Sequence, residues 1–441
     1  DLPMPAPISL VEATRRIRAG TLTPLELLDA CLEQVRKYDS VVRAWALVDE
    51  AAARQVAEER TREAGLGQWR GPLHGIPVGI KDIIDVAGLP TAAGSPLCGH
   101  EAATADSPLV AALRRAGAVI VGKTVTVEFA CFDPSPTRNP WNLTHTPGGS
   151  SSGSAAALAT GMCLGALGTQ TGGSLVRPSA FCGVATCKPT FGTLSTEGIV
   201  PASPSLDHPG PMARKVADIA VLLDSLRGES SLGSLRPWGP PRLGLLDGPL
   251  LELADLAVRG ATRSAMDKLA RAGAELAPIV VSRAFDDVMK MHRRIMSVEA
   301  AAYHRERFAK HRVQYGPMIA SLLDEGLAVS AVDYVAAKAW HRKFRRQAAA
   351  LLEGVDALIM PSTHTTAPAT LETTGTPQFQ APWSLARLPV VSLPCGVAAD
   401  GLPAAVQLVG RLDDEAQLLR IAAWCEQALG FEAVPPLIQG P

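Results

Sequence analysis

The sequence predicts an α/β fold, and three observations favour it. Between residues 75 and 210, short β-branched runs alternate with Ala-rich helical stretches and Gly/Ser loops, which is typical of βαβ units. Apolar runs return at 357–361, 389–396 and 405–410, and we expect these strands to join the same sheet. No repeat, low-complexity segment or Pro/Ser linker divides residues 1–441, so we expect one large domain.

Local signals place the elements in order along the chain. Thr23-Pro24-Leu25-Glu26 combines an N-cap, a proline at the first helical position and a capping-box acid, which predicts an amphipathic helix. Residues 75–80 form a continuous apolar run, the pattern of a buried strand. A small-residue helix is expected at 154–160 and a short strand at 162–167. Helical patterns dominate from 240 to 355, and we interpret their basic segments as solvated helix faces.

Composition and charge exclude several classes of function. The chain has 42 Lys and Arg against 43 Asp and Glu, a net charge of -1, and so lacks the positive charge that a phosphate-backbone binder needs. We therefore expect no nucleic-acid partner. The eight cysteines include no Cys-x-x-Cys pair, so we expect buried, reduced thiols and a cytoplasmic compartment. No run of 18 apolar residues occurs, so we expect no membrane span.

Two short motifs match known nucleotide-binding or catalytic patterns, but the secondary structure expected around them does not fit either pattern. Residues 117–124 fit the phosphate-loop pattern G-x-x-x-x-G-K-[ST], but Ala-Val-Ile-Val between the glycines predicts a strand where the loop must be. Residues 149–153 fit the nucleophile-elbow pattern G-x-S-x-G, with Ser151 as nucleophile. That elbow needs a strand directly before it, whereas the preceding NPWNLTHTPG has the composition of a loop. We reject both interpretations.

The segment 148–183 carries the residues that point to chemistry. It contains two Ser/Gly loops, the first leading into a predicted helix and the second following a predicted strand, and they hold Ser150 and Ser174. In a parallel βαβ arrangement both loops lie at the carboxyl edge of the sheet, where open α/β folds bind their ligands. Lys81 directly follows the strand at 75–80 and reaches a sheet edge in the same way.

Glycines beside Ser174 leave backbone N–H groups uncovered, as an oxyanion hole requires. The expected donors are the N–H groups of Thr171, Gly172, Gly173 and Ser174. Apart from His145, five residues before Ser150, no histidine lies near either serine in the sequence, so a Ser-His-Asp triad is unsupported and a lysine is the available base. A free lysine has a pKa of ~10.4, and burial must lower it to about 7 to 8 for work near neutral pH.

These segments resemble the amidase signature hydrolases, the family of fatty acid amide hydrolase, peptide amidase, malonamidase and the A subunit of the glutamyl-tRNA amidotransferase. The similarity is dense over 75–210, with GIPVGIKDIID, TRNPWNLTHTPGGSSSGSAA, GTQTGGS, FCGVATCKPTFG and SLDHPGPM, and it recurs at 389–410. The resemblance implies an α/β/α fold around a mixed, largely parallel, twisted sheet. Residues 75–210 would form the signature core, and about 240–385 a variable, mostly helical region that shapes the substrate pocket.

The resemblance also implies a mechanism. Lys81 occupies the position of the family's catalytic lysine, Ser150 that of the bridging serine after a cis peptide bond, and Ser174 that of the nucleophile. Neutral Lys81 would accept the proton of Ser150, and Ser150 that of Ser174, which would attack the amide carbonyl and form an acyl-enzyme. This relay needs no metal or cofactor.

The resemblance implies a small-molecule amide substrate, with esters or carbamates as further candidates, and we expect a monomer or homodimer. The alternative function is that of a glutamine-hydrolysing A subunit in an amidotransferase complex. Phe129, Ala130, Cys131 and Phe132, together with Pro382-Trp383, favour apolar acyl or aryl groups over charged ones.

The chain departs from the family pattern near the nucleophile. Gln170 and Val176 stand where the family commonly has Asp and Arg, and Arg177 follows one position later. Ser384 and Arg387 replace Asn and Gly of the C-terminal loop. Because an acid and a base are lost together, we interpret the first change as replacement of a structural pair, with catalysis retained.

Overall fold

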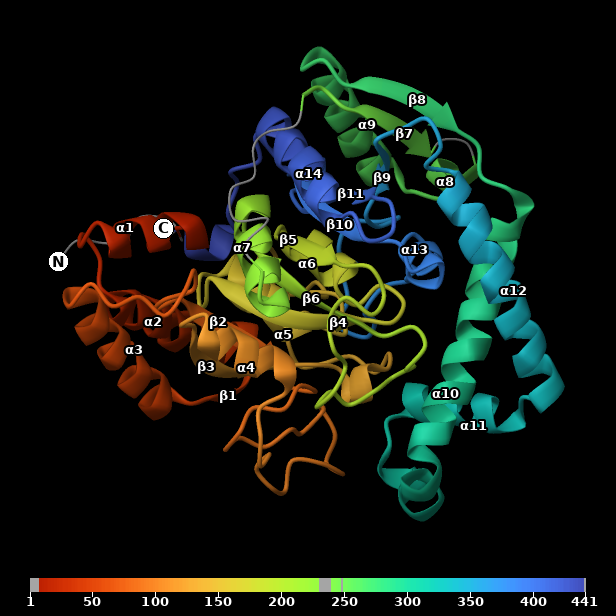
Figure 1. Cartoon of the computed structure of the whole chain (residues 1–441). Coiled ribbons are helices and arrows are strands. Elements are labelled where there is room, and N and C mark those ends of the chain that lie inside the picture. Colours follow the sequence, from red (N-terminus) through yellow and green to blue (C-terminus); the bar gives the residue numbers. More distant parts are fainter. Residues whose placement is uncertain (1–7, 230–238, 247–248, 440–441) are drawn as a thin grey trace.

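The computed structural model describes residues 8–229, 239–246 and 249–439. An eleven-stranded sheet forms its centre, in the order β1-β3-β2-β4-β6-β5-β10-β11-β9-β7-β8 (Figure 1). The strands are β1 (Trp45–Val48), β2 (Pro77–Lys81), β3 (Val119–Thr124), β4 (Gly165–Gln170), β5 (Ala185–Lys188), β6 (His208–Ala213), β7 (Arg242–Leu246), β8 (Glu275–Ile279), β9 (Ala357–Pro361), β10 (Val390–Val397) and β11 (Pro403–Val409). The late strands β9, β10 and β11 join the same sheet, which confirms the prediction.

Helices pack around this sheet, and α10, α11 and α12 stand together to one side of it (Figure 1). The α-helices are α1 (Leu10–Arg18), α2 (Pro24–Val42), α3 (Glu50–Gly65), α4 (Pro108–Arg115), α5 (Ser152–Ala159), α6 (Val176–Cys182), α7 (Val216–Arg227), α8 (Pro249–Glu252), α9 (Leu256–Arg271), α10 (Val288–His311), α11 (Pro317–Ala328), α12 (Ala331–Ala350), α13 (Ala381–Ala386) and α14 (Glu415–Leu429). No helix in the described part of the chain is long and apolar enough to cross a membrane.

The sheet is mixed, as predicted, but it is not largely parallel. Parallel pairs join β2 to β3 and β4, and β7 to β8 and β9. The other six pairings are antiparallel. The expectation extended the βαβ pattern of the first half to the whole sheet, whereas β10 and β11 form a hairpin and β6 returns between β4 and β5 without a helical crossover.

Several local predictions hold in the structure. The capping box is present at the start of α2, where the Thr23 side chain accepts from the Glu26 N–H and Pro24 takes the first helical position. Residues 119–124 are strand β3, so the apparent phosphate-loop motif is a buried strand and not a loop. The small-residue helix is α5, and the strand expected at 162–167 is β4, three residues further along.

The region from 240 to 355 is mostly helical, as predicted, but it also contains β7 and β8. These two strands form one edge of the sheet. β8 reads Glu-Leu-Ala-Pro-Ile and is only partly buried, and a proline in such a short segment argues against a strand unless it lies at an edge. Little in the local pattern of residues therefore indicates this strand.

Candidate active site

Lys81 ends strand β2 and lies wholly inside the protein. Its ammonium group donates to Ser150 Oγ at 2.7 Å and to Thr169 Oγ1 at 2.8 Å. Burial lowers the pKa of Lys81 to about 7, and the Asp207 carboxylate opposes that shift in part. The apolar residues of β2 around it belong to the main hydrophobic core, which accounts for the burial. The lowered pKa lies in the range expected of a lysine base.

Ser150 and Ser174 line one cavity, named here the serine cavity, of about 20 Å³. Ser150 follows a cis peptide bond from Gly149, the feature that the resemblance implies at this position. Ser174 lies in the loop between β4 and α6, and its backbone carbonyl accepts from the N–H of Ser151 at 3.3 Å. The two Ser/Gly loops therefore meet at the edge of the sheet where Lys81 ends, as predicted.

Three of the expected oxyanion donors, the N–H groups of residues 172–174, share a peptide with the carbonyl of the preceding residue. Each of these carbonyls has a hydrogen-bond partner. Thr171 O lies 3.0 Å from His292 Nε2, Gly172 O accepts from Ser384 Oγ at 2.9 Å, and Gly173 O accepts from the Arg177 N–H at 2.9 Å. In a trans peptide the carbonyl and the next N–H point in opposite directions. The N–H groups of residues 172–174 thus point away from these partners, and all three residues line the serine cavity.

Gln170 explains how the loop is supported without the usual acid and base. Its Oε1 accepts from the N–H groups of Leu175 and Val176, each at 3.0 Å, and its Nε2 donates to Ser384 Oγ at 3.1 Å. Because this amide is neutral, the buried Val176 beside it needs no charge. The geometry agrees with the interpretation that a structural pair has been replaced.

Arg387 adopts a φ of 64°, in the region that favours glycine, the residue that the family commonly has there. Its guanidinium lies 3.9 Å from the Phe191 ring centroid and donates to Ser205 O at 3.2 Å.

His292 is a cavity residue that the sequence did not predict, and it lies on α10, more than a hundred residues from either serine. It is 3% exposed, it lines the serine cavity, and burial lowers its pKa. Its Nε2 contacts the Thr171 carbonyl, an acceptor, so a neutral imidazole must carry its proton on that nitrogen. No motif marks this residue, because only the packing of α10 against the β4–α6 loop brings it to the site.

A second cavity of about 230 Å³ adjoins the first, and both are lined by Ala130 and Thr171. The segment from Thr196 to Pro209 forms much of its wall. Asp207 in this segment accepts from Thr171 Oγ1 at 2.6 Å and from the N–H groups of Ala202 and Ser203. Burial raises the pKa of Asp207 to about 6. The carboxylate thus joins the wall of the second cavity to the loop that carries Ser174.

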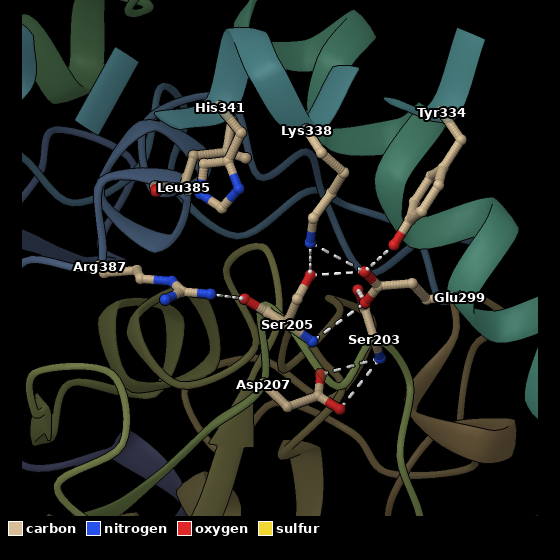
Figure 2. A network of polar contacts seen from close by, with 9 residues as sticks. All are labelled: Ser203, Ser205, Asp207, Glu299, Tyr334, Lys338, His341, Leu385 and Arg387. Carbon is tan, nitrogen blue, oxygen red and sulfur yellow. Dashed lines mark hydrogen bonds and ion pairs between the residues drawn. The ribbon is translucent and has the colours of Figure 1, made fainter. Parts of the chain in front are cut away.

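Glu299 on α10 anchors the same wall to the helices (Figure 2). Its carboxylate accepts from Ser203 Oγ, from the Ser205 N–H and hydroxyl, from Tyr334 Oη and from the Lys338 ammonium, the last two on α12. Burial alone would raise the pKa of Glu299, but these hydrogen bonds outweigh burial and lower it. Helices α10 and α12 therefore hold a wall of the site in place.

The two motifs rejected from the sequence have structural roles. Ser151 is fully buried and its Oγ exchanges hydrogen bonds of 3.3 Å with the backbone of Thr169. Lys123 of the apparent phosphate loop pairs with Asp82 at 2.8 Å inside the protein. Asp82 thus points away from its neighbour Lys81, as alternation along a strand predicts.

The residues that suggested an apolar pocket divide between core and cavity. Ala130 and Phe132 line the serine cavity. Phe129 instead packs between His304 and Tyr315, and Trp383 lies in the core of the helical region against Phe285. Two of the six residues therefore line the cavity, and the apolar character of Phe129 and Trp383 reflects core packing.

All eight cysteines are free, and every one except Cys98 is buried.

Comparisons with known proteins agree with this geometry. The family model described as Amidase matches residues 26–419. The chain is 36% identical to an amidase of Pseudomonas putida, with 98% of each chain covered. It is 34% identical to the A subunit of the glutamyl-tRNA(Gln) amidotransferase of Anaeromyxobacter dehalogenans, with 97% of this chain and 98% of that one covered. The crystal structure of the peptide amidase from Stenotrophomonas maltophilia superposes with a TM-score of 0.86 at 31% identity, covering 99% of this chain and all of that one. The chain belongs to the amidase family of amide-hydrolysing enzymes.

Proposed function

We propose that the protein hydrolyses carboxylic amides through Ser174 as nucleophile, Ser150 as proton relay and Lys81 as base. The observation that carries this proposal is the 2.7 Å contact between a buried lysine, whose pKa is lowered to about 7, and Ser150, in the cavity that Ser174 also lines. A base with a pKa near the working pH is the best compromise between being unprotonated and accepting a proton.

The reaction divides into two steps. Ser174 Oγ attacks the carbonyl carbon while its proton passes to Ser150 and that of Ser150 to Lys81, and the negative charge on the oxygen meets the N–H groups of residues 171–174. The proton then returns along the relay to the leaving nitrogen, the C–N bond breaks, and an acyl-enzyme remains. Water attacks this ester by the same relay and releases the acid. Esters and carbamates have the same reacting carbonyl and are further candidate substrates.

Replacement of Ser174 tests the proposal. Ser174→Ala removes the attacking oxygen, so we expect loss of amide hydrolysis and of labelling by a fluorophosphonate. Because this loop side chain makes few packing contacts, the free energy of unfolding should stay unchanged. Ser151→Ala is the matched control, because the neighbouring serine is buried away from the cavity. A folded Ser174→Ala enzyme that keeps its rate, or a label on Ser151, would contradict the assignment.

A second candidate function is glutamine hydrolysis within an amidotransferase. The similarity to the A subunit of an amidotransferase over nearly the whole chain favours it. Hydrolysis restricted to glutamine, together with co-purification of a second protein from its native host, would favour this role. Hydrolysis of other amides by the isolated chain would favour the independent amidase.

A further inference from the structure

The second half of helix α12 is basic, and one of its charged side chains does not face solvent fully. Residues 334–352 contain five Lys and Arg residues and no Asp or Glu. Arg342, Lys343 and Arg346 are exposed, in agreement with the interpretation of solvated helix faces. Arg345 is only partly exposed, and its Nε is buried without a hydrogen-bond partner in the described part of the chain. The interpretation of a solvated face therefore does not account for Arg345.

Arg345 belongs to a group of cations around His341. Residues 338, 341 and 345 share one face of α12, and His341 Nε2 lies 2.6 Å from the Leu385 carbonyl of α13 (Figure 2). Burial lowers the pKa of His341 to about 4, and the Leu385 carbonyl opposes that shift. Arg387, the C-cap residue of α13, lowers it further by its positive charge, as do Lys338 and Arg345. Three cations therefore lie around a neutral histidine.

Only one of these three cations has a carboxylate partner among the described residues. The Lys338 ammonium pairs with Glu299 at 3.2 Å. Arg345 makes neither a hydrogen bond nor an ion pair with the described residues, and Arg387 makes no ion pair with them. Burial lowers the pKa of Arg387, the charge of Arg345 adds to that shift, and Glu299 opposes it. Two neighbouring positive charges are therefore left without an acid of their own, which is unfavourable for partly buried groups.

The two guanidinium groups have free donors that a ligand can reach. The Arg387 guanidinium lies 3.9 Å from the Phe191 ring centroid and its Nη2 donates to Ser205 O at 3.2 Å, so its orientation is fixed. Its Nε is buried without an acceptor. Nη1 of Arg387 and both Nη groups of Arg345 also lack an acceptor among the described residues, but they are not buried. The two arginines therefore present several unused N–H donors to solvent.

We propose that Arg345 and Arg387 form a binding site for a dianionic phosphate group. Two positive charges without an acid match two negative charges, and the phosphate oxygens can accept from both guanidinium groups at once. The exposed cations of α12 add a positive potential that attracts such an anion. Neither arginine lines the serine cavity or the second cavity, so the site is distinct from the candidate active site and does not rest on the proposed function. A bound phosphate would link α12 to the end of α13.

Calorimetric titration with inorganic phosphate tests the site. At pH 8, where phosphate is a dianion, and at an ionic strength held constant with chloride, we expect the wild-type protein to bind phosphate at a single site. Arg345→Gln and Arg387→Gln each remove a charged donor and should raise Kd roughly 10–100-fold. Arg342→Gln is the matched control, because it removes the same charge from an exposed position on the same helix. Its Kd should stay close to that of the wild type.

Three results of this titration would overturn the proposal. The first is a wild-type protein that does not bind phosphate. The second is wild-type affinity in either Arg345→Gln or Arg387→Gln, which places the anion elsewhere. The third is an equal loss of affinity in Arg342→Gln, because the effect then follows the net charge of the helix and not the two arginines.

A measurement on the wild type replaces any variant that does not fold. Phenylglyoxal modifies accessible guanidinium groups, and peptide mass spectrometry gives the extent of modification at each arginine. Bound phosphate should slow the modification of Arg345 and Arg387 but not that of Arg342. An unchanged rate at either Arg345 or Arg387 overturns the proposal.

Glycerol 2-phosphate identifies the source of the phosphate group. Binding at least as tight as that of inorganic phosphate, and equally sensitive to Arg345→Gln, supports a site for phosphate esters. Binding of inorganic phosphate alone supports a site for the free ion. Binding of neither compound overturns the proposal.

Discussion

Two buried lysines on neighbouring parallel strands differ in their hydrogen-bond partners, and only Lys123 has a carboxylate among them. Lys81 ends β2 and contacts the hydroxyls of Ser150 and Thr169. Lys123 lies on β3, where the register pairs it with Ile80, so its side chain points to the other face of the sheet and pairs with Asp82. Burial lowers the pKa of both lysines, but at Lys123 a carboxylate at 2.8 Å opposes that shift strongly.

The contrast shows that burial alone does not make a lysine into a base. Lys123 also donates to Pro90 O at 2.9 Å and to Thr91 Oγ1 at 3.0 Å, so each hydrogen of its ammonium has an acceptor. These contacts favour the cation. Lys81 has hydroxyl partners that accept from the ammonium or donate to the neutral amine, so they fit either protonation state. The partners therefore distinguish Lys123, which is held as a structural cation, from Lys81, the base that we propose.

The largest expected effect is loss of activity on removal of the Lys81 amine. Lys81→Met keeps an unbranched side chain but removes the base, and we expect kcat/KM to fall by at least about 10³-fold, because general bases contribute about 10²–10⁴-fold and triad members act as a unit. Lys123→Met is the matched control and should retain fluorophosphonate labelling of Ser174 wherever it is folded. Similar activity losses in both folded variants would remove the distinction between the two lysines.

For stability we expect the opposite ranking, with Lys123→Met losing more free energy of unfolding than Lys81→Met. Lys123→Met leaves the Asp82 carboxylate buried without its cation, and breaking such a pair costs about 3–5 kcal/mol. Lys81→Met removes a buried amine without an acidic contact and leaves the hydroxyls of Ser150 and Thr169, which both line cavities, so we expect a smaller loss. Urea unfolding at pH 7 measures both. If Asp82→Asn combined with Lys123→Met is no more stable than Lys123→Met alone, the stranded carboxylate is not the cause.

The sequence predicted the parts of the site that depend on local order along β2, β4 and the following loops. Lys81, Ser150 and Ser174 follow from motifs at the edge of the sheet, and the loop before a helix and the loop after the next strand must meet there. Those motifs carry no information about His292 or Glu299, since α10 reaches the site only through tertiary packing.

The environment of Arg177 is a second feature that the sequence could not predict. Its place in the sequence marks it as a displaced family arginine, but the absence of an acidic partner is a property of the packed interior in the described part of the chain. The same holds for Phe129 and Trp383, whose apolar character fits a core as well as a pocket. The antiparallel pairings escaped prediction because the residue pattern does not distinguish a hairpin or a returning strand from a helical crossover, at β6 as well as at β10 and β11.

The smallest expected effect, and the most direct test of the difference between the two lysines, is the pH dependence of the rate. The amine of Lys81 accepts a proton only when it is neutral, and its pKa is lowered to about 7. Below pH 7 the lysine is protonated and kcat/KM should rise about tenfold for each pH unit, equivalent to ~1.4 kcal/mol; above pH 7 the rate should level off. Lys123 does not enter this profile, because its amine contacts none of the reacting groups.

Two variants separate Lys81 from the other titrating groups near it. Asp207, whose pKa is raised to about 6, stabilises the protonated form of Lys81, so Asp207→Asn should move the break in the profile to lower pH while Asn still accepts from Thr171 and the loop N–H groups. His292 has a lowered pKa and its Nε2 hydrogen-bonds the Thr171 carbonyl, which takes no part in the proposed relay, so His292→Gln should leave the position of the break unchanged even where the rate falls. If the break in the pH–rate profile disappears in His292→Gln and keeps its position in Asp207→Asn, the titrating group is the histidine. Lys81 would then differ from Lys123 in its surroundings but would not act as the base.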